Sequence, residues 1–349
     1  ISCSLVGSEM CIRDRFWTIT EADGIYKPVY AVKSLPGAVF EIRSAEDIYT
    51  LDGVMHYAKG EVVDTVTTGS DGMASSKELY LGKYEVQEIT APHGMVLNGT
   101  IQTVELTYAG QEVAITETAG NLYNERQKVK VSLSKVLEQN ELFGIGMNGE
   151  LKNITFGLYA KTDLVAGDGT VIPAGGLIEI VTFDDNGMVT VSTDLPLGSY
   201  YLQERSTDEH YILDDVHYEF EFSYSSQETQ VVEISVNDGN PIKNDLKYGM
   251  ISGRKVDEDG HVIAGAIFGL FRNDENEYTA ENAYLTAESA QDGTFKFEKV
   301  PFGTWVVREI QPAKGFVLNE KAYPVTVYFP MRSFSMKISP FASVVKTSS

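Results

Sequence analysis

The chain has 349 residues, of which 43% are hydrophobic and 22% are charged. This is an ordinary globular composition, which at this length predicts two or three folded domains and excludes a wholly disordered chain. The formal charge of -22 disfavours binding to nucleic acid or to an anionic membrane, because so acidic a chain repels phosphate.

The first fifteen residues differ in character from the rest of the chain. Both cysteines, Cys3 and Cys11, lie there, so a cysteine zinc site, a redox CxxC pair and a disulfide framework are excluded for the body of the protein. The run SLVGSEMCIRDR resembles translated sequencing-adapter read-through, and we interpret residues 1–15 as a non-native, adapter-derived segment. The alternative is a genuine short leader. Under either interpretation this end of the chain says nothing about compartment.

Three copies of one pattern occupy the remainder of the chain. The segment from Gly82 to Asn98 recurs from Gly198 to Asp214 and again from Gly303 to Asn319. The copies lie roughly 105 to 120 residues apart, which is the size of a whole domain and not of a solenoid unit. We therefore expect an N-terminally truncated repeat 1 at 16–127, repeat 2 at 128–246, and repeat 3, with an incomplete or aberrant final strand, at 247–349.

Each repeat reads as a series of short strands. About seven runs alternate between apolar and polar residues, with turn signals roughly every 8 to 12 residues. Asp71-Gly72, Asn186-Gly187 and Asp292-Gly293 occupy equivalent positions and predict hairpin turns with a positive φ at Gly. The sequence thus predicts an all-β fold of three tandem Ig-like or prealbumin-like antiparallel β-sandwich domains.

One acidic residue in each repeat stands out. Strand alternation places Glu88 on the same face as Tyr84 and Val86, which are core residues. A carboxylate that faces a core is costly unless it is paired or protonated. The equivalent residues of the later repeats share this position: Glu204 and Glu309.

Lysines and asparagines keep register with these acids. Lys27 and Lys255 each lie 13 residues before a phenylalanine that aligns across the repeats, whereas Lys135 lies 21 before it because of the insertion ELFGIGMN. Asn124 and Asn244 fall in the closing strands of repeats 1 and 2, each 11 residues before the next lysine. The last strand of repeat 3, SFSMKISPFASVV, contains no asparagine.

A buried lysine beside a buried glutamate has two interpretations. The first is a structural ion pair, which contributes little net stability because of its desolvation cost. The second is chemical, because burial lowers the pKa of lysine and raises that of glutamate until a neutral amine faces a neutral acid. The amine then attacks the asparagine carboxamide while the acid polarises it and moves protons. Ammonia leaves, and an amide joins the first strand to the last.

These residues carry a family resemblance. The YEVQEITAPHGMVLN type of segment resembles the acidic box of Gram-positive pilin and adhesin domains, and residues 24 to 330 resemble three tandem collagen-adhesin (Cna) B-type domains of the prealbumin-like, SpaA-type pilin class. The resemblance implies Lys–Asn isopeptide bonds assisted by a catalytic glutamate, and a stalk or pilus role at the cell wall, outside the cell. It implies two sets and one incomplete set: Lys27, Glu88 and Asn124; Lys135, Glu204 and Asn244; and Lys255 with Glu309.

No other site is expected. The five histidines lack metal-ligand spacing, and no nucleotide-binding or nucleophile-elbow motif occurs, so we expect no metal, no cofactor and no enzyme activity beyond this single-turnover self-modification. No apolar run approaches the roughly 20 residues of a spanning helix, so direct membrane insertion of this fragment is not expected. The expected partners are other domains of the same surface protein or pilus.

Two alternatives stay open. Repeat 2 carries the longest insertions, Leu142 to Asn153 and Ala166 to Gly176, and these are the predicted place for a host ligand such as collagen or a glycan. The repeats could also be accessory domains of a larger surface enzyme. Neither a signal peptide nor a sorting motif is present in this fragment.

Overall fold

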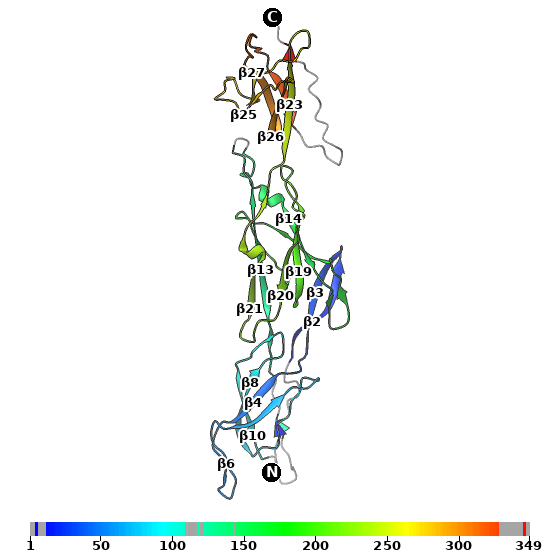
Figure 1. Cartoon of the computed structure of the whole chain (residues 1–349). Coiled ribbons are helices and arrows are strands. Elements are labelled where there is room, and N and C mark those ends of the chain that lie inside the picture. Colours follow the sequence, from blue (N-terminus) through cyan, green and yellow to red (C-terminus); the bar gives the residue numbers. More distant parts are fainter. Residues whose placement is uncertain are drawn as a thin grey trace. The chain divides into compact units, whose positions relative to one another are not determined.

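The computed structural model describes residues 4–5, 12–108, 110, 117–118, 122–141, 144–327 and 345–346 (Figure 1). It divides into two compact units, the first made of residues 1–136, 149–207 and 213–243, and the second of residues 137–148, 208–212 and 244–349. Repeats 1 and 2 thus fall in the first unit, apart from short segments of repeat 2 that belong with repeat 3.

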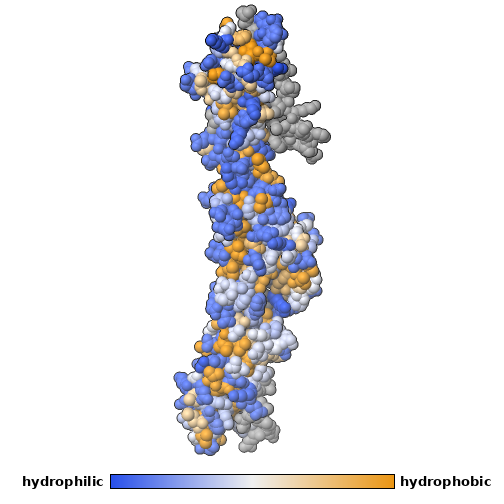
Figure 2. Space-filling model, viewed as in Figure 1, coloured by the Kyte–Doolittle hydropathy of each residue, from blue (hydrophilic) through white to orange (hydrophobic). Residues whose placement is uncertain are grey.

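The described part of the chain is almost entirely strand and turn, which confirms the all-β prediction. Its helices are two short 3-10 turns, η1 (Glu150–Asn153) and η2 (Val236–Gly239). No helix among the described residues has the length and apolar character needed to cross a membrane. Polar residues cover much of the face of the molecule seen in Figure 2, with apolar residues scattered among them.

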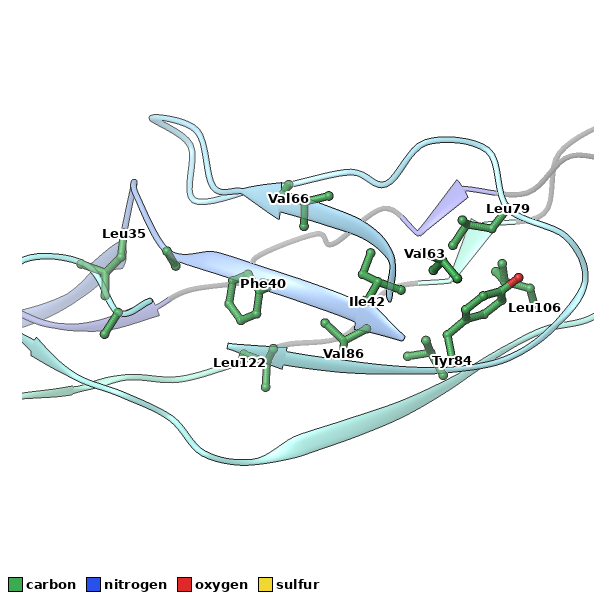
Figure 3. Packing of buried hydrophobic residues seen from close by; sticks show 14 of the residues in the cluster. Leu35, Phe40, Ile42, Val63, Val66, Leu79, Tyr84, Val86, Leu106 and Leu122 are labelled. Carbon is green, nitrogen blue, oxygen red and sulfur yellow. The ribbon is translucent and has the colours of Figure 1, made fainter. Parts of the chain in front are cut away.

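Repeat 1 is built on a four-stranded antiparallel sheet in the order β10-β8-β4-β7. Alternation buries one face of each strand, and the side chains of Phe40, Ile42, Tyr84 and Val86 converge with Leu122 in the core (Figure 3). The strands of this repeat, with three short pairs, are β4 (Val39–Ser44), β7 (Val62–Thr67), β8 (Gly82–Thr90), β10 (Ile101–Leu106), β5 (Ile48–Tyr49) with β6 (Met55–Tyr57), β9 (Met95–Val96) with β12 (Glu125–Arg126), and β1 (Ser4–Leu5) with β11 (Glu117–Thr118).

The first long hairpin does not join the sheet of repeat 1. Strands β2 (Ile12–Ala22) and β3 (Ile25–Ser34) pair with each other across a two-residue turn, Asp23-Gly24, in which both φ angles are positive, a turn that matches strand twist. Ile25 then pairs in parallel with Leu177 of β17 (Leu177–Thr182). The hairpin is therefore an extension of a sheet of repeat 2, although the sequence assigns residues 16–34 to repeat 1.

Repeat 2 has two main sheets and the short two-stranded pair β15-β16. One has the order β2-β3-β17-β14-β19-β20, and the other has the order β18-β13-β21, with β22 also paired to β13. The first strand of the repeat, β13, lies antiparallel to β18 and parallel to β21. The bounds are β13 (Lys128–Leu137), β14 (Thr155–Ala160), β15 (Leu164–Val165), β16 (Val171–Ile172), β17 (Leu177–Thr182), β18 (Met188–Thr190), β19 (Gly198–Ser206), β20 (Tyr218–Phe222), β21 (Val231–Ser235) and β22 (Ile242–Asn244).

The second unit contains repeat 3. Its sheets have the orders β26-β23-β29 and β25-β24-β27-β28, and Phe268, Phe297 and Trp305 are buried in its core. A smaller cluster joins Ile145, Tyr211 and Leu246. The strands are β23 (Tyr248–Val256), β24 (Ile267–Arg272), β25 (Leu285–Glu288), β26 (Thr294–Pro301), β27 (Gly303–Gln311), β28 (Tyr323–Val327) and β29 (Val345–Lys346).

The predicted turn glycines adopt the expected conformation. Gly72, Gly187 and Gly293 have φ angles of 75°, 73° and 76°, in the left-handed region that favours glycine. Each donates its N–H to the carbonyl three residues earlier, at 2.9, 3.0 and 2.8 Å. The three repeats therefore share one turn type at this position.

The described parts of both repeat 2 insertions pack on the chain itself. Ile145, in the first insertion, is buried in the small cluster of the second unit, and residues 142–143 lie outside the described residues. In the second insertion, strand β16 pairs with β15, which directly precedes the insertion. There the main-chain N–H groups of Gly167 and Asp168 donate to the carbonyls of Phe16 and Trp17.

Candidate functional site

A buried glutamate lies at the equivalent position of every repeat. Glu88, Glu204 and Glu309 are 1%, 3% and 2% exposed, on β8, β19 and β27. The aromatic residue four positions before each is completely buried. Its polar atom donates to a carbonyl four residues earlier, as in Tyr200 to Pro196. The prediction that these glutamates face the core is confirmed.

A β-bulge sits beside each glutamate. On β8, Glu88 pairs with Phe40, while Thr90 pairs with Val39, which leaves Ile89 as an extra residue. The same shift occurs where Glu204 pairs with Phe156 and where Glu309 pairs with Phe268. A bulge bends its strand and redirects side chains. Here it ends the regular alternation directly after the glutamate.

A main-chain amide holds one oxygen of each glutamate. The N–H of Asn98 donates to Oε2 of Glu88 at 2.7 Å, and the N–H of Asp214 donates to Oε2 of Glu204 at 2.6 Å. The N–H of Asn319 makes the same bond to Glu309 at 2.9 Å. In all three repeats the donor lies ten residues after the acid. We call this hydrogen bond the latch.

Repeat 2 brings the predicted lysine to its glutamate. Lys135 Nζ lies 3.3 Å from Oε1 of Glu204, and both side chains are 0% exposed. Burial lowers the pKa of Lys135, which the negative charge of Glu204 partly opposes. The ring centroid of Phe156 lies 5.3 Å from the amine. Since a low dielectric disfavours the charged amine, this site favours the neutral, nucleophilic form more than water does.

The third predicted residue of repeat 2 is also buried. Asn244 is 1% exposed and ends β22. Its main-chain carbonyl accepts the N–H of Glu138 at 3.0 Å. The latch residue Asp214 adds a further contact, because its carboxylate accepts the hydroxyl of Tyr218 at 2.6 Å. Burial, followed by this hydrogen bond, raises the pKa of Tyr218.

Repeat 3 forms the same acid–amine pair. Lys255 Nζ lies 2.9 Å from Oε2 of Glu309, and the two side chains are 0% and 1% exposed. Oε1 of Glu309 has no hydrogen-bond partner within the described residues. Most of the closing strand, where the sequence contains no asparagine, lies outside the described residues.

Repeat 1 pairs its acid with the carboxamide. Nδ2 of Asn124 donates to Oε2 of Glu88 at 2.6 Å and to the carbonyl of Val96 at 3.0 Å. Oε1 of Glu88 has no partner within the part of the chain that the structure describes. Burial raises the pKa of Glu88, and the hydrogen bonds from Asn98 and Asn124 oppose that shift.

The structure does not bring Lys27 to this site. Lys27 is exposed on β3, where it pairs with Thr20 of the N-terminal hairpin. Glu88 and Asn124 are both 1% exposed. Because β3 continues the sheet of repeat 2, it does not supply the first strand of repeat 1. Among the described residues the buried lysines are Lys135 and Lys255.

Sequence reasoning missed the bulge and the latch. The signal for the latch was present, because each recurring segment ends in Asn98, Asp214 or Asn319 at a constant ten residues after the acid. Nearly every residue has a main-chain N–H, and residue identity does not reveal which acceptor that N–H bonds in the fold. No group of three or more His, Cys, Asp or Glu side chains within the described residues could hold a metal ion.

These observations define a class of protein, namely tandem β-sandwich repeats with a buried acid next to a lysine or an asparagine. A family model described as the SpaA prealbumin-like fold domain matches residues 29–119, 145–239 and 249–338. The matches cover most of the chain, which therefore belongs to the SpaA prealbumin-like family. This confirms the resemblance found in the sequence.

A solved structure shares the fold. The Bacillus anthracis TIE protein is 20% identical with a TM-score of 0.57, and the match covers 94% of this chain and 48% of that one. This chain thus spans about half the length of the TIE structure. The BcpA major pilin subunit of Bacillus cereus is 14% identical, with a TM-score of 0.36 and coverage of 99% of both chains. No curated protein matches the sequence.

Proposed function

We propose that the chain is a structural stalk or shaft segment of a Gram-positive surface adhesin or pilin, with a Lys–Asn isopeptide bond in repeat 2. The observation that carries this proposal is the fully buried pair of Lys135 and Glu204, whose Nζ and Oε1 atoms lie 3.3 Å apart. An ion pair at the surface would not produce a nucleophilic amine, because water keeps both the lysine and the glutamate charged.

The reaction needs no external reagent. Lys135 passes a proton to Glu204, and the neutral Nζ attacks Cγ of Asn244. Glu204 donates a proton to the carboxamide as the tetrahedral centre forms and collapses. The new bond is Nζ–Cγ, the broken bond is Cγ–Nδ2, and the leaving group is ammonia. Glu204 also takes up the proton that the attacking nitrogen loses. The remaining proton of the starting ammonium ends on Glu204 when ammonia leaves as NH3, or departs with it as ammonium, so the glutamate is not consumed.

Such a bond suits a load-bearing rod. Lys135 lies in the first strand of repeat 2, and Asn244 lies in the last, so the amide would close a loop of more than one hundred residues. A cross-link of this span stabilises by about 4 to 5 kcal/mol in the chain-entropy model. It also blocks the peeling of terminal strands, which is how a sandwich pulled from its ends fails.

We do not propose an isopeptide bond in repeat 1 or repeat 3. Repeat 1 places its acid beside Asn124 while Lys27 is exposed, and repeat 3 places its acid beside Lys255. Each has part of the set. We therefore assign the bond to repeat 2, and Glu88, Glu309 and Lys255 to buried polar pairs of the core.

The partners we propose are other domains of the same surface protein or pilus, at the cell wall outside the cell. Membership of the SpaA family supports this assignment. The insertions of repeat 2 make internal contacts where they are described, so we do not propose a collagen or glycan site on them. The chemistry is a single self-modification and not enzymatic turnover.

Intact-mass analysis of the purified chain tests the bond. Each bond removes one ammonia, about 17 Da by this amine chemistry, so we expect one such loss. Peptide mapping would place it between Lys135 and Asn244. Glu204→Gln should restore the full mass, and Glu309→Gln, which alters the equivalent acid of repeat 3, should leave the loss unchanged. A wild-type chain with the full encoded mass would contradict the proposal.

A further inference from the structure

A loop of repeat 2 lies against the segment that carries the latch of repeat 1. This loop, residues 224–230, follows β20 and belongs to the same compact unit as repeat 1. The side chain of Gln227 accepts the N–H of Ala91 at 3.0 Å and donates to the carbonyl of Ile89 at 3.4 Å. Its main-chain carbonyl accepts the N–H of Leu97 at 2.8 Å.

These three contacts lie at the two ends of the loop that follows Glu88. Ile89 is the bulge residue next to the acid, and Leu97 directly precedes Asn98, whose N–H latches Oε2 of Glu88. Gln227 therefore contacts both ends of the ten-residue loop that connects the acid to its latch. In between, the hydroxyl of Tyr224 donates to the carbonyl of Met95 at 3.2 Å.

A second glutamine fixes the loop of repeat 2 itself. Gln127, in the link between the repeats, is 1% exposed. Its amide nitrogen donates to the carbonyls of Ser226 and Thr229 at 3.1 and 2.8 Å, and its amide oxygen accepts the N–H of Ser225 at 2.9 Å. Its own N–H donates to the carbonyl of Gly94 at 2.9 Å. Every polar group of this buried side chain is thereby satisfied.

The same loop of repeat 3 is more exposed within the part of the chain that the structure describes. The residue seven positions after the acid is Met95 in repeat 1 and Phe316 in repeat 3, and these are 6% and 40% exposed. The next two residues of repeat 3, Val317 and Leu318, are 69% and 36% exposed. The latch thus forms in both repeats, and of these two loops the loop of repeat 1 is the one that described residues of a neighbouring repeat cover.

We infer that repeat 2 holds the buried acid of repeat 1 in place, with Gln227 as the positioning residue. The contacts that join the two repeats are then also the contacts that hold the loop next to Glu88. If the contacts between the two repeats open, the loop after Glu88 loses its support. The amide hydrogen of Asn98 then exchanges faster with solvent, and water reaches the carboxyl group of Glu88. The inference rests on hydrogen bonds and burial, and it does not require bond formation in any repeat.

Amide hydrogen exchange on the full chain tests this coupling, because the chain contains three latches to compare. In Gln227→Ala, we expect the Asn98 amide to exchange at least about tenfold faster, since hydrogen bonds worth about 1 kcal/mol each are lost. The amides of Asp214 and Asn319 should keep their wild-type rates. Tyr224→Phe removes one hydroxyl contact to the same loop, and it should accelerate Asn98 alone by a smaller factor.

A second readout separates positioning from general destabilisation. Carbon-13 NMR of the Glu88 carboxyl should show its raised pKa falling towards the ordinary value in Gln227→Ala, because water enters the site. A global loss of stability would instead accelerate all three latch amides together. The inference is overturned if the Asn98 amide and the Glu88 carboxyl behave as in the wild type, or if the three amides change in parallel.

Discussion

The main-chain N–H of Lys135 donates to the carbonyl of Gly187 at 2.7 Å, and Lys255 makes the same bond to Gly293 at 2.8 Å. The two glycines are the predicted turn glycines of repeats 2 and 3. In each of these two repeats the hairpin turn therefore bonds to the backbone of the buried lysine. Its left-handed glycine fixes how the lysine strand enters the core, and so where the amine meets the acid.

Gly187→Ala should destabilise the chain strongly. A Cβ at this position would lie 2.2 Å from the carbonyl oxygen of Lys135, and the φ angle of 73° is itself unfavourable for alanine. We expect a loss of about 3 kcal/mol or more in the free energy of unfolding, measured by urea denaturation, together with slower formation of the bond proposed for repeat 2.

Gly169 provides the matched control for this change. Its φ angle is +88°, but a Cβ there would meet nothing within 4 Å. Gly169→Ala should cost only the backbone strain, about 1 kcal/mol. Equal losses in the two variants would show that contact with the lysine strand is not what makes Gly187 necessary.

Removing the buried amine should be far more costly than removing an exposed one. In an Asn244→Ala background, where the proposed bond cannot form, Lys135→Ala leaves Glu204 buried without its counter-charge. We expect about 3 to 5 kcal/mol of destabilisation. Lys27→Ala in the same background should stay within about 0.5 kcal/mol, because Lys27 is exposed. Urea denaturation curves measure both, and a large loss for Lys27→Ala would show that it has a buried role.

Glu88→Gln should stabilise the chain at neutral pH. Burial raises the pKa of Glu88 above its ordinary value of 4.5, so the folded state binds more protons than the unfolded state between these two values. The stability contributed by Glu88 is thus greatest at acid pH and falls as the pH rises through the raised pKa. Glutamine has no such dependence and keeps hydrogen-bonding capacity for Asn98 and Asn124.

Calorimetric melting temperatures at pH 4 and pH 8 measure this difference. The advantage of Glu88→Gln should be larger at pH 8 and shrink at pH 4, where both side chains are neutral. Other acids titrate in both proteins and cancel in the comparison. A variant that melts below the wild type at pH 8 would mean that the ionised carboxylate stabilises the core.

Much of the fold and part of the site could be predicted from the sequence. Alternation showed that Glu204 shares a face with Tyr200 and Leu202, and all three are buried. The spacing of the repeats placed Lys135 and Lys255 beside their acids, as the structure has them. Spacing along the sequence did not predict the position of Lys27, because spacing does not determine which sheet a strand joins. The hairpin of β2 and β3 pairs with β17, and that choice depends on long-range packing.

The sequence by itself determined the three repeats, their strand character, the inward-facing acids and the turn glycines. These follow from side-chain periodicity and backbone preference, which are local properties. Only the tertiary structure decided that a main-chain amide latches each acid, where the bulges fall, and that a glutamine of repeat 2 contacts the loop after the acid of repeat 1. Such features depend on main-chain hydrogen bonds and on contacts between strands and repeats, which side-chain periodicity does not specify.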